Sequence, residues 1–297
     1  MKIAVVGSIN VDQTVVADRI PLKGETLFGK NINYIPGGKG ANQAVAMAKL
    51  GAEVEMYGCV GDDEYGQQMI NNLQKHKIKT NNIKVIKGVP TGIAIITLGD
   101  NDNTIVVIKG ANDKVDREYI DSIKSELLKN DMVVLQHEIP LDTVHYIVNI
   151  CAENKIPTVL NPAPAANVPS DIVDKVTYLT PNEHEVGLIF GKDKSLEELL
   201  KKYPKKLIVT LGSDGVTTAL NDKEILKVPV RKTTVVDTTG AGDTLNGAFS
   251  VRVCMGDDIG SALKYANIAA SLSIEKLGAQ SGMPTNKEVE KIMEEMK

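Results

Sequence analysis

The sequence predicts a three-layer α/β/α fold with a mostly parallel central sheet. Short runs rich in Val, Ile and Leu alternate along most of the chain with segments of helical periodicity. Continuous apolar runs are typical of strands buried on both faces of a parallel sheet, and the periodic segments are typical of the helices that cover it. We expect residues 1–297 to form a single domain, into which a small β-sheet lid is inserted at about 13–36 and 91–110.

Six apolar runs are predicted as strands of the central sheet: Lys2–Ser8, Glu53–Val60, Asp131–Gln136, Pro157–Asn161, Thr177–Thr180 and Lys206–Leu211. Helices are predicted between them, because apolar residues recur three and four positions apart on one face. These helices are Ala41–Leu50, Asp63–His76, Asp116–Lys129 and Leu141–Asn154.

Two stretches interrupt this alternation. Gln13–Tyr34 has strand-like pieces together with Pro21 and Gly24, but no helical periodicity. Thr91–Leu98 and Thr104–Lys109 are β-branched runs on either side of a turn-rich loop, which predicts a hairpin. We expect the two stretches to form the lid.

The C-terminal quarter is predicted to be helical. A strand that ends at Val235-Val236 is expected to lead through a Gly-rich turn into a helix at Gly242–Met255. A second helix is predicted around residues 263–274, and a charged helix begins near Asn286.

Composition excludes several classes of protein. The 34 Lys and Arg are balanced by 38 Asp and Glu, with no basic run to follow a nucleic acid backbone. No apolar run approaches the roughly 18 residues of a membrane span. The three cysteines are scattered and form no CxxC pair, and the N-terminus enters a predicted strand without a signal peptide. We therefore expect reduced thiols and a cytoplasmic protein.

The most informative motif is Asp237-Thr-Thr-Gly-Ala-Gly-Asp243, where a turn of small residues enters a predicted helix. Backbone N–H groups and the positive end of a helix dipole make such a turn suited to phosphate. Asp243 would face the bound anion, although an Asp in a first turn also stabilises a helix by itself. A dinucleotide-binding fingerprint is excluded, because Leu245 stands at its third glycine.

A second motif, Gly37-Gly-Lys-Gly-Ala-Asn42, also enters a predicted helix. Its glycines allow a backbone to approach a ligand closely, and Lys39 and Asn42 bring hydrogen-bond donors to the same point. A tight turn without a ligand is the alternative.

A third motif, Gly7-Ser-Ile-Asn-Val-Asp12, follows the first predicted strand, at the edge where open α/β sheets bind ligands. Asn10 and Asp12 would project to one side and suit the hydroxyls of a small polyol, although an Asx turn would use the same residues. Thr180–Glu185 and Thr210–Gly215 also end predicted strands, but a helix cap at Asn182 and an ordinary turn would explain them equally well.

Together these motifs resemble the ribokinase-like carbohydrate kinase family. The resemblance runs from Lys2 to about Pro284 and includes Leu160-Asn-Pro-Ala-Pro-Ala165 and Gly278-Ala-Gln280. It implies ATP-dependent phosphorylation of D-ribose at O5, giving ribose 5-phosphate and ADP. The alternatives are a kinase for deoxyribose, another pentose or a nucleoside, and a non-catalytic sugar-binding regulator, which would not need Asp243 together with the glycines before it.

The resemblance also assigns roles to residues. Asp243 is implied as the general base, beside an anion hole formed by the N–H groups of Gly240, Ala241 and Gly242. The implied ribose contacts are Asn10, Asp12, Gly38, Lys39, Asn42, Glu138 and Asp243. The implied nucleotide contacts are Asn182, Thr210, Leu211, Gly212, Ser213, Asp214, Gly215, Gly242 and Asn267.

Two cations and a partner follow from the same resemblance. Glu185 would hold Mg²⁺ largely through water. A monovalent cation, K⁺, would be held by Asp237, Thr239, Ser273, Lys276 and Gly278. The chain departs from the family pattern at Gly282, where a Ser ligand is expected, and at Asn267, where a His is common. A homodimer formed through the lid is expected.

Overall fold

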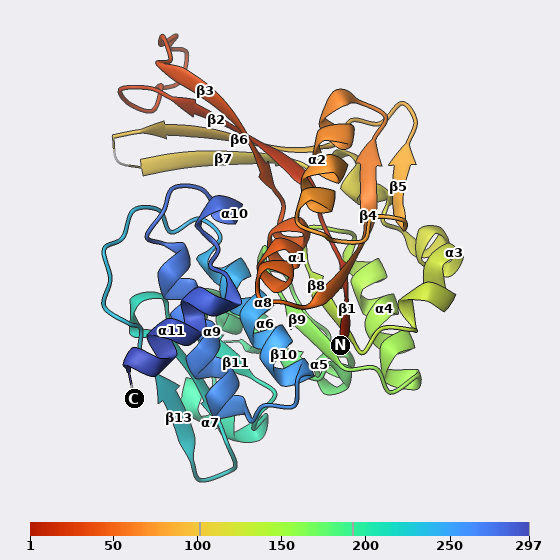
Figure 1. Ribbon diagram of the computed structural model, residues 1–297, viewed down its shortest axis with the longest axis vertical. Coiled ribbons are helices and arrows are strands. Elements are labelled where there is room, and N and C mark those ends of the chain that lie inside the picture. Colours follow the sequence, from red (N-terminus) through yellow and green to blue (C-terminus); the bar gives the residue numbers. More distant parts are fainter. Residues whose placement is uncertain (101, 192, 297) are drawn as a thin grey trace.

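The computed structural model describes residues 1–100, 102–191 and 193–296 and confirms the predicted three-layer fold (Figure 1). Its central sheet has the strand order β10-β9-β8-β1-β4-β5, and all its neighbouring strands are parallel. The strands are β1 (Lys2–Val6), β4 (Glu53–Gly61), β5 (Ile83–Ile86), β8 (Met132–Gln136), β9 (Thr158–Asn161) and β10 (Tyr178–Leu179).

The sheet separates two apolar cores, and β1 contributes to both. Ile3 and Val5 point to a core with α1 (Lys39–Lys49), α2 (Glu64–Lys75), α8 (Ala241–Cys254), α9 (Ile259–Ser273) and α11 (Asn286–Glu295). Ala4 and Val6 point to a core with α3 (Arg117–Leu127), α4 (Leu141–Glu153), α5 (Ser170–Lys175), α6 (Glu183–Phe190) and α7 (Leu196–Lys202). Because both strand faces are buried, the strand is apolar throughout.

The lid is a separate four-stranded sheet in the order β3-β2-β6-β7, which projects from the body (Figure 1). Its strands are β2 (Asn10–Val16), β3 (Asn31–Gly37), β6 (Gly92–Gly99) and β7 (Asp102–Ile108). The predicted hairpin is confirmed, since β6 and β7 pair antiparallel. Two predicted motifs lie at the base of the lid, because β2 begins at Asn10 and β3 ends at Gly37.

A third sheet continues the body beyond β10, and the predicted strand Lys206–Leu211 belongs to this sheet and not to the central one. It consists of β11 (Ile208–Thr210), β12 (Val216–Ala219) and β13 (Ile225–Val228), paired antiparallel. Parallel bridges from Leu179 to Leu207 and from Asn182 to Thr210 connect it to the central sheet. The end of the predicted strand at Thr210 therefore lies beside the start of α6.

The prediction of a strand at Val235-Val236 was wrong. These residues are 59% and 55% exposed and lie in a loop. The Val236 N–H donates to the carbonyl of Ile274, just after α9, at 2.8 Å. The segment thus runs along the end of a helix instead of joining a sheet, which β-branched composition alone could not reveal. None of the described helices combines the length and the apolarity that a membrane crossing would need.

Candidate active site

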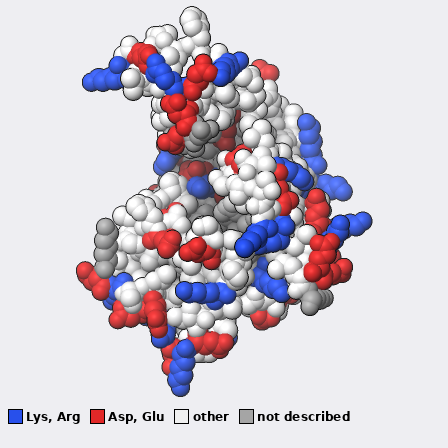
Figure 2. Space-filling model, turned by 90° about the vertical axis from the view of Figure 1, so that its left-hand side faces the viewer, with Lys and Arg blue, Asp and Glu red and all other residues white. Residues whose placement is uncertain are grey.

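Charged side chains from four separate segments gather where the lid joins the body, in a hollow visible in Figure 2. Asp12 comes from β2, Lys39 begins α1, Glu138 follows β8, and Asp243 lies in the first turn of α8. Burial, together with the charges of Glu138 and Asp243, raises the pKa of Asp12 from 3.8 to about 7. Such a mixed cluster offers both donors and acceptors to a ligand rich in hydroxyls.

Lys39 keeps its positive charge in this hollow. Burial alone would lower the pKa of its ammonium group, but the carboxylates of Asp243, Glu138 and Glu185 raise it by more. A buried ammonium group is stabilised by such partners and can in turn stabilise further negative charge. Lys39 is therefore the cationic group of this cluster that could stabilise negative charge on a bound ligand.

The glycines of the second motif let α1 approach the end of β1. A Cβ at position 40 would lie 2.6 Å from the backbone nitrogen of Ser8, and Gly38 has a φ of +88°. Glu138 joins the same segments, because its Oε2 accepts from Ser8 Oγ at 2.6 Å and from the Lys39 N–H at 2.9 Å. The motif is thus more than a turn: it places Lys39 beside the polar end of β1.

The amide of Asn10 has a fixed orientation. Its Oδ1 accepts from Asn112 Nδ2 at 2.7 Å, and Asn112 Oδ1 accepts from the Ile9 N–H at 2.9 Å. A ligand in the hollow would therefore meet the Nδ2 donor of Asn10, which suits a hydroxyl oxygen.

Asp243 is 7% exposed, and amides hold both of its carboxylate oxygens. Oδ2 accepts from Asn42 Nδ2 at 3.0 Å, and Oδ1 accepts from Gln43 Nε2 at 3.1 Å. Burial raises the pKa of Asp243, while Lys39 and the two amides oppose this rise. A carboxylate in this setting is equipped to accept a proton from a bound hydroxyl.

The start of α8 offers an anion site beside Asp243. Gly240 has a φ of +78°, and a Cβ there would lie 2.7 Å from the Cβ of Ala279, so only glycine fits. The Ala241 N–H donates to the Thr238 carbonyl at 3.2 Å. The N–H groups of Gly242 and Asp243 follow, and a helix provides no acceptor for N–H groups in its first turn.

A cavity of about 660 Å³ lies next to this helix start, a size that suits a nucleotide. The predicted residues that line it are Thr210, Gly212, Ser213, Gly215, Ala241, Gly242 and Asn267. Asn267 Nδ2 donates to the carbonyls of Val228 at 3.1 Å and Pro229 at 2.7 Å, which fixes its amide. Because Gly242 lines the cavity and Asp243 belongs to the charged cluster, the two sites meet at adjacent residues.

Three predicted nucleotide contacts are not among the residues that line this cavity. Asn182 caps α6, where its Oδ1 accepts from the Glu185 N–H and its own N–H donates to Glu185 Oε2, both at 2.8 Å. The Leu211 N–H donates to the Gly215 carbonyl, and Asp214 is exposed. The capping interpretation of Asn182 is therefore what the structure shows.

The segments of the predicted cation site lie together. Asp237 accepts from the N–H groups of Thr239 at 2.9 Å and Gly278 at 2.8 Å; burial raises its pKa, but these bonds lower it by more. At Gly282, a Cβ would lie 2.2 Å from the Ser273 carbonyl oxygen and 3.5 Å from that of Lys276. Both carbonyl oxygens thus lie near position 282, which lacks a side chain, and both belong to the ligand set predicted for a monovalent cation.

Sequence reasoning missed a set of buried amides around Asp243: Gln43, Gln136, Asn161 and Gln280, together with Asn112 beside Asn10. One signal could have revealed the first of them. Asn42 and Gln43 are adjacent in a short helix whose other residues between Lys39 and Lys49 are small or apolar, so at least one amide was expected to be buried and paired.

Comparisons with known proteins agree with this geometry. The family model described as pfkB family carbohydrate kinase matches residues 1–286. A ribokinase of Bacillus subtilis (strain 168) is 46% identical over 98% of this chain and 99% of its own length. A deoxyribokinase of Salmonella typhi is 35% identical over 96% of both chains.

A solved structure gives the same result. The structure of Arabidopsis thaliana ribokinase complexed with ribose and ATP matches with a TM-score of 0.89 and 31% identity, covering 98% of each chain. The fold, the meeting of a polar hollow with a nucleotide-sized cavity, and these relatives lead to one conclusion. The chain belongs to the pfkB family of carbohydrate kinases.

Proposed function

We propose that this chain transfers the γ-phosphoryl group of ATP to the 5-hydroxyl of D-ribose, giving ribose 5-phosphate and ADP. One observation carries the proposal: buried Asp243 lies in the charged hollow, and its neighbour Gly242 lines the nucleotide-sized cavity. A hydroxyl in the hollow and a phosphate in the cavity would therefore meet at Asp243. The ribokinase relatives support ribose as the acceptor.

In the proposed mechanism Asp243 accepts the proton of the ribose 5-hydroxyl as this oxygen attacks the γ-phosphorus. The N–H groups at the start of α8 and the charge of Lys39 stabilise the transferring phosphoryl group. Asn10, Asp12 and Glu138 would bind the other hydroxyls, and the lid would exclude water that could compete as acceptor.

Two cations complete the proposed site. Among the described residues, no group of three or more His, Cys, Asp or Glu is placed to hold a metal, so Mg²⁺ would be held by ATP and water, with Glu185 nearby. K⁺ would be held by Asp237, Thr239 and the carbonyls of Ser273, Lys276 and Gly278, and would neutralise Asp237 beside the anion site.

Substrate choice tests the proposal directly. A coupled assay that detects ADP, run with ATP and a panel of pentoses, hexoses and nucleosides, should give the highest kcat/KM with D-ribose. A higher kcat/KM with deoxyribose or a nucleoside would mean that this compound, and not ribose, is the acceptor. Binding of sugar without ADP release would favour a non-catalytic regulator.

Asn10 is expected to select ribose over 2-deoxyribose. Its Nδ2 is the donor left to the sugar, and a buried donor that loses its partner costs about 1–3 kcal/mol, or roughly 5- to 150-fold in kcat/KM. Asn10→Met should therefore reduce the ratio of kcat/KM for the two sugars toward one. Equal use of both sugars by the wild type, or an unchanged ratio in the variant, would contradict this role.

Activity is expected to increase several-fold in KCl compared with tetramethylammonium chloride at matched ionic strength. Asp237 is the only side-chain carboxylate among the proposed ligands, so Asp237→Asn should reduce this response. Equal rates in the two salts would show that no functional K⁺ site exists in this chain.

We also propose that the chain forms a homodimer through the lid and that it acts in the cytoplasm. β7 is an edge strand, and both of its faces carry exposed apolar side chains: Ile105, Val106, Val107 and Ile108. An exposed apolar edge strand favours pairing with another sheet, and a second lid has a matching surface. The three cysteines are free, as a reducing compartment would keep them.

A further inference from the structure

We propose that Gln43 is a positioning residue that fixes which oxygen lone pairs of Asp243 face the acceptor hydroxyl. The inference rests on the proposed function, in which Asp243 is the general base. Gln43 is 0% exposed and lies on the second turn of α1, between the central sheet and α8. It is therefore placed to act on the reaction only through Asp243.

The orientation of the Gln43 amide is determined by its neighbours. Gln136, at the end of β8, donates from Nε2 to Gln43 Oε1 at 2.7 Å. The nitrogen of Gln43 must then face the other way, where it donates to Asp243 Oδ1 at 3.1 Å and to Asn161 Oδ1 at 3.2 Å. Asn161 is itself oriented, since its Nδ2 donates to the Thr180 carbonyl at 3.1 Å.

A second chain of amides holds the other oxygen of Asp243. Asn42 Nδ2 donates to Asp243 Oδ2 at 3.0 Å, and Asn42 Oδ1 accepts from Gln280 Nε2 at 3.0 Å. Gln280 Oε1 in turn accepts from Asn72 Nδ2 at 2.8 Å. The carboxylate is thus tied on both oxygens, so it cannot rotate about its χ2 bond without breaking a buried hydrogen bond.

Loss of the Gln43 donor should have two consequences. The carboxylate becomes free to rotate, which misplaces the lone pair that accepts the proton and lowers kcat. A donor to the charged form is also removed, so the pKa of Asp243 rises above its already raised value. Because the base works deprotonated, the acid limb of the pH–rate profile should move to higher pH. Gln43 is fully buried and is not expected to touch ribose or ATP, so neither KM should change.

The test is Gln43→Met, which keeps the length of the side chain and removes both amide groups. We expect kcat to fall roughly 10- to 100-fold and the acid limb to move up by about one pH unit, with both KM values unchanged.

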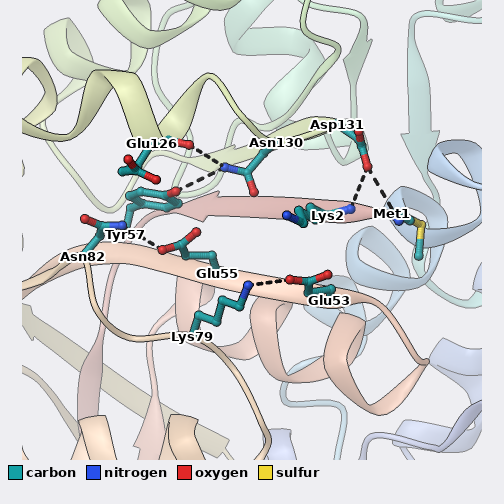
Figure 3. Close-up of polar contacts among 10 residues, drawn as sticks. All are labelled: Met1, Lys2, Glu53, Glu55, Tyr57, Lys79, Asn82, Glu126, Asn130 and Asp131. Atoms are coloured by element: carbon teal, nitrogen blue, oxygen red, sulfur yellow. Dashed lines mark hydrogen bonds and ion pairs between the residues drawn. The ribbon is translucent and has the colours of Figure 1, made fainter.

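The matched control is Asn130→Leu. Asn130 is also a buried amide, but it precedes the N-terminal end of β8, whereas Gln136 ends that strand, and it donates to Tyr57 Oη at 3.2 Å (Figure 3). The control should lose stability without a shift in the pH profile.

Gln136→Met is the second variant, which removes the group that orients Gln43 without touching Asp243. It should shift the pH profile in the same direction by a smaller amount, and its effect should not add to that of Gln43→Met. A folded Gln43→Met protein with the wild-type pH profile would overturn the inference. If that protein does not fold, an unchanged profile in Gln136→Met would overturn it.

One measurement separates this inference from the proposed function. The carboxyl carbon of Asp243 can be titrated by ¹³C NMR without substrate, its signal being assigned by its loss in Asp243→Asn. A higher pKa in Gln43→Met than in wild type supports the positioning role even if ribose is not the acceptor. The same pKa in both proteins rejects that role even if ribose is phosphorylated.

Discussion

Asp243→Asn is expected to lower kcat by roughly 10²- to 10⁴-fold, the usual contribution of a positioned proton acceptor. The substitution keeps the shape of the side chain but removes the group that accepts the proton of the ribose hydroxyl. Binding of ribose and ATP should be largely retained, because the other proposed contacts do not change. A steady-state assay gives kcat, and calorimetric titration gives the two affinities.

The hydrogen bonds of Asp243 add a second expectation. Asn42 and Gln43 donate to different oxygens of the carboxylate, and an asparagine offers only one oxygen. One buried donor would lose its acceptor, at a cost of about 1–3 kcal/mol. The loss of a buried charge, whose burial raises the pKa of Asp243, offsets part of this cost, so Asp243→Asn should be destabilised by less than this amount in chemical denaturation.

The matched control is Asp222→Asn, at an exposed aspartate in the turn before β13. This substitution should change neither kcat nor the stability in chemical denaturation. Turnover close to wild type in Asp243→Asn would reject Asp243 as the general base.

Ile105→Asp or Val107→Asp in β7 is expected to dissociate the homodimer and weaken ribose affinity. The two side chains are 54% and 48% exposed in the single chain, so a charge there should leave the fold intact. In the dimer the same charge would be buried against an apolar partner surface without a counter-ion, which is strongly unfavourable. Since the proposed sugar site lies where the lid joins the body, a lid without its partner should hold ribose less well.

Sedimentation equilibrium measures this directly. The wild type should have about twice the 32.0 kDa mass of one chain, and the lid variants should approach the mass of the single chain. Val85→Asp is the control, because Val85 is 53% exposed on β5, the edge strand of the central sheet, away from the lid. A wild type of single-chain mass at micromolar concentration would refute the dimer, and a lid variant that stays dimeric would refute this interface.

Much of the structure of this protein could be predicted from local sequence patterns. Apolar runs and helical periodicity predicted five of the six strands of the parallel sheet and the helices α1 to α4 to within a few residues, because burial on both faces requires such patterns. β5 was not predicted, and the predicted strand Lys206–Leu211 joined the antiparallel third sheet. The β6–β7 hairpin was predictable from its turn residues. The need for glycine at positions 38, 40 and 240 could also be predicted, because a positive φ or a close backbone approach excludes a side chain at each.

Tertiary structure decided the rest. Val235 and Val236 have strand-like side chains, but among the described residues they pair with no strand, and Val236 instead donates its N–H to the Ile274 carbonyl after α9. Asn182 forms the helix cap that its spacing to Glu185 permits, and only the placement of α6 beside β11 brings it next to Thr210. The amides around Asp243 come from α1, β8, β9 and the short helix α10 (Ala279–Gly282), and Gln43 meets partners 93, 118 and 200 residues away in sequence. Sequence determines which side chains can donate and accept hydrogen bonds, but only the packing of distant elements determines which donor meets which acceptor.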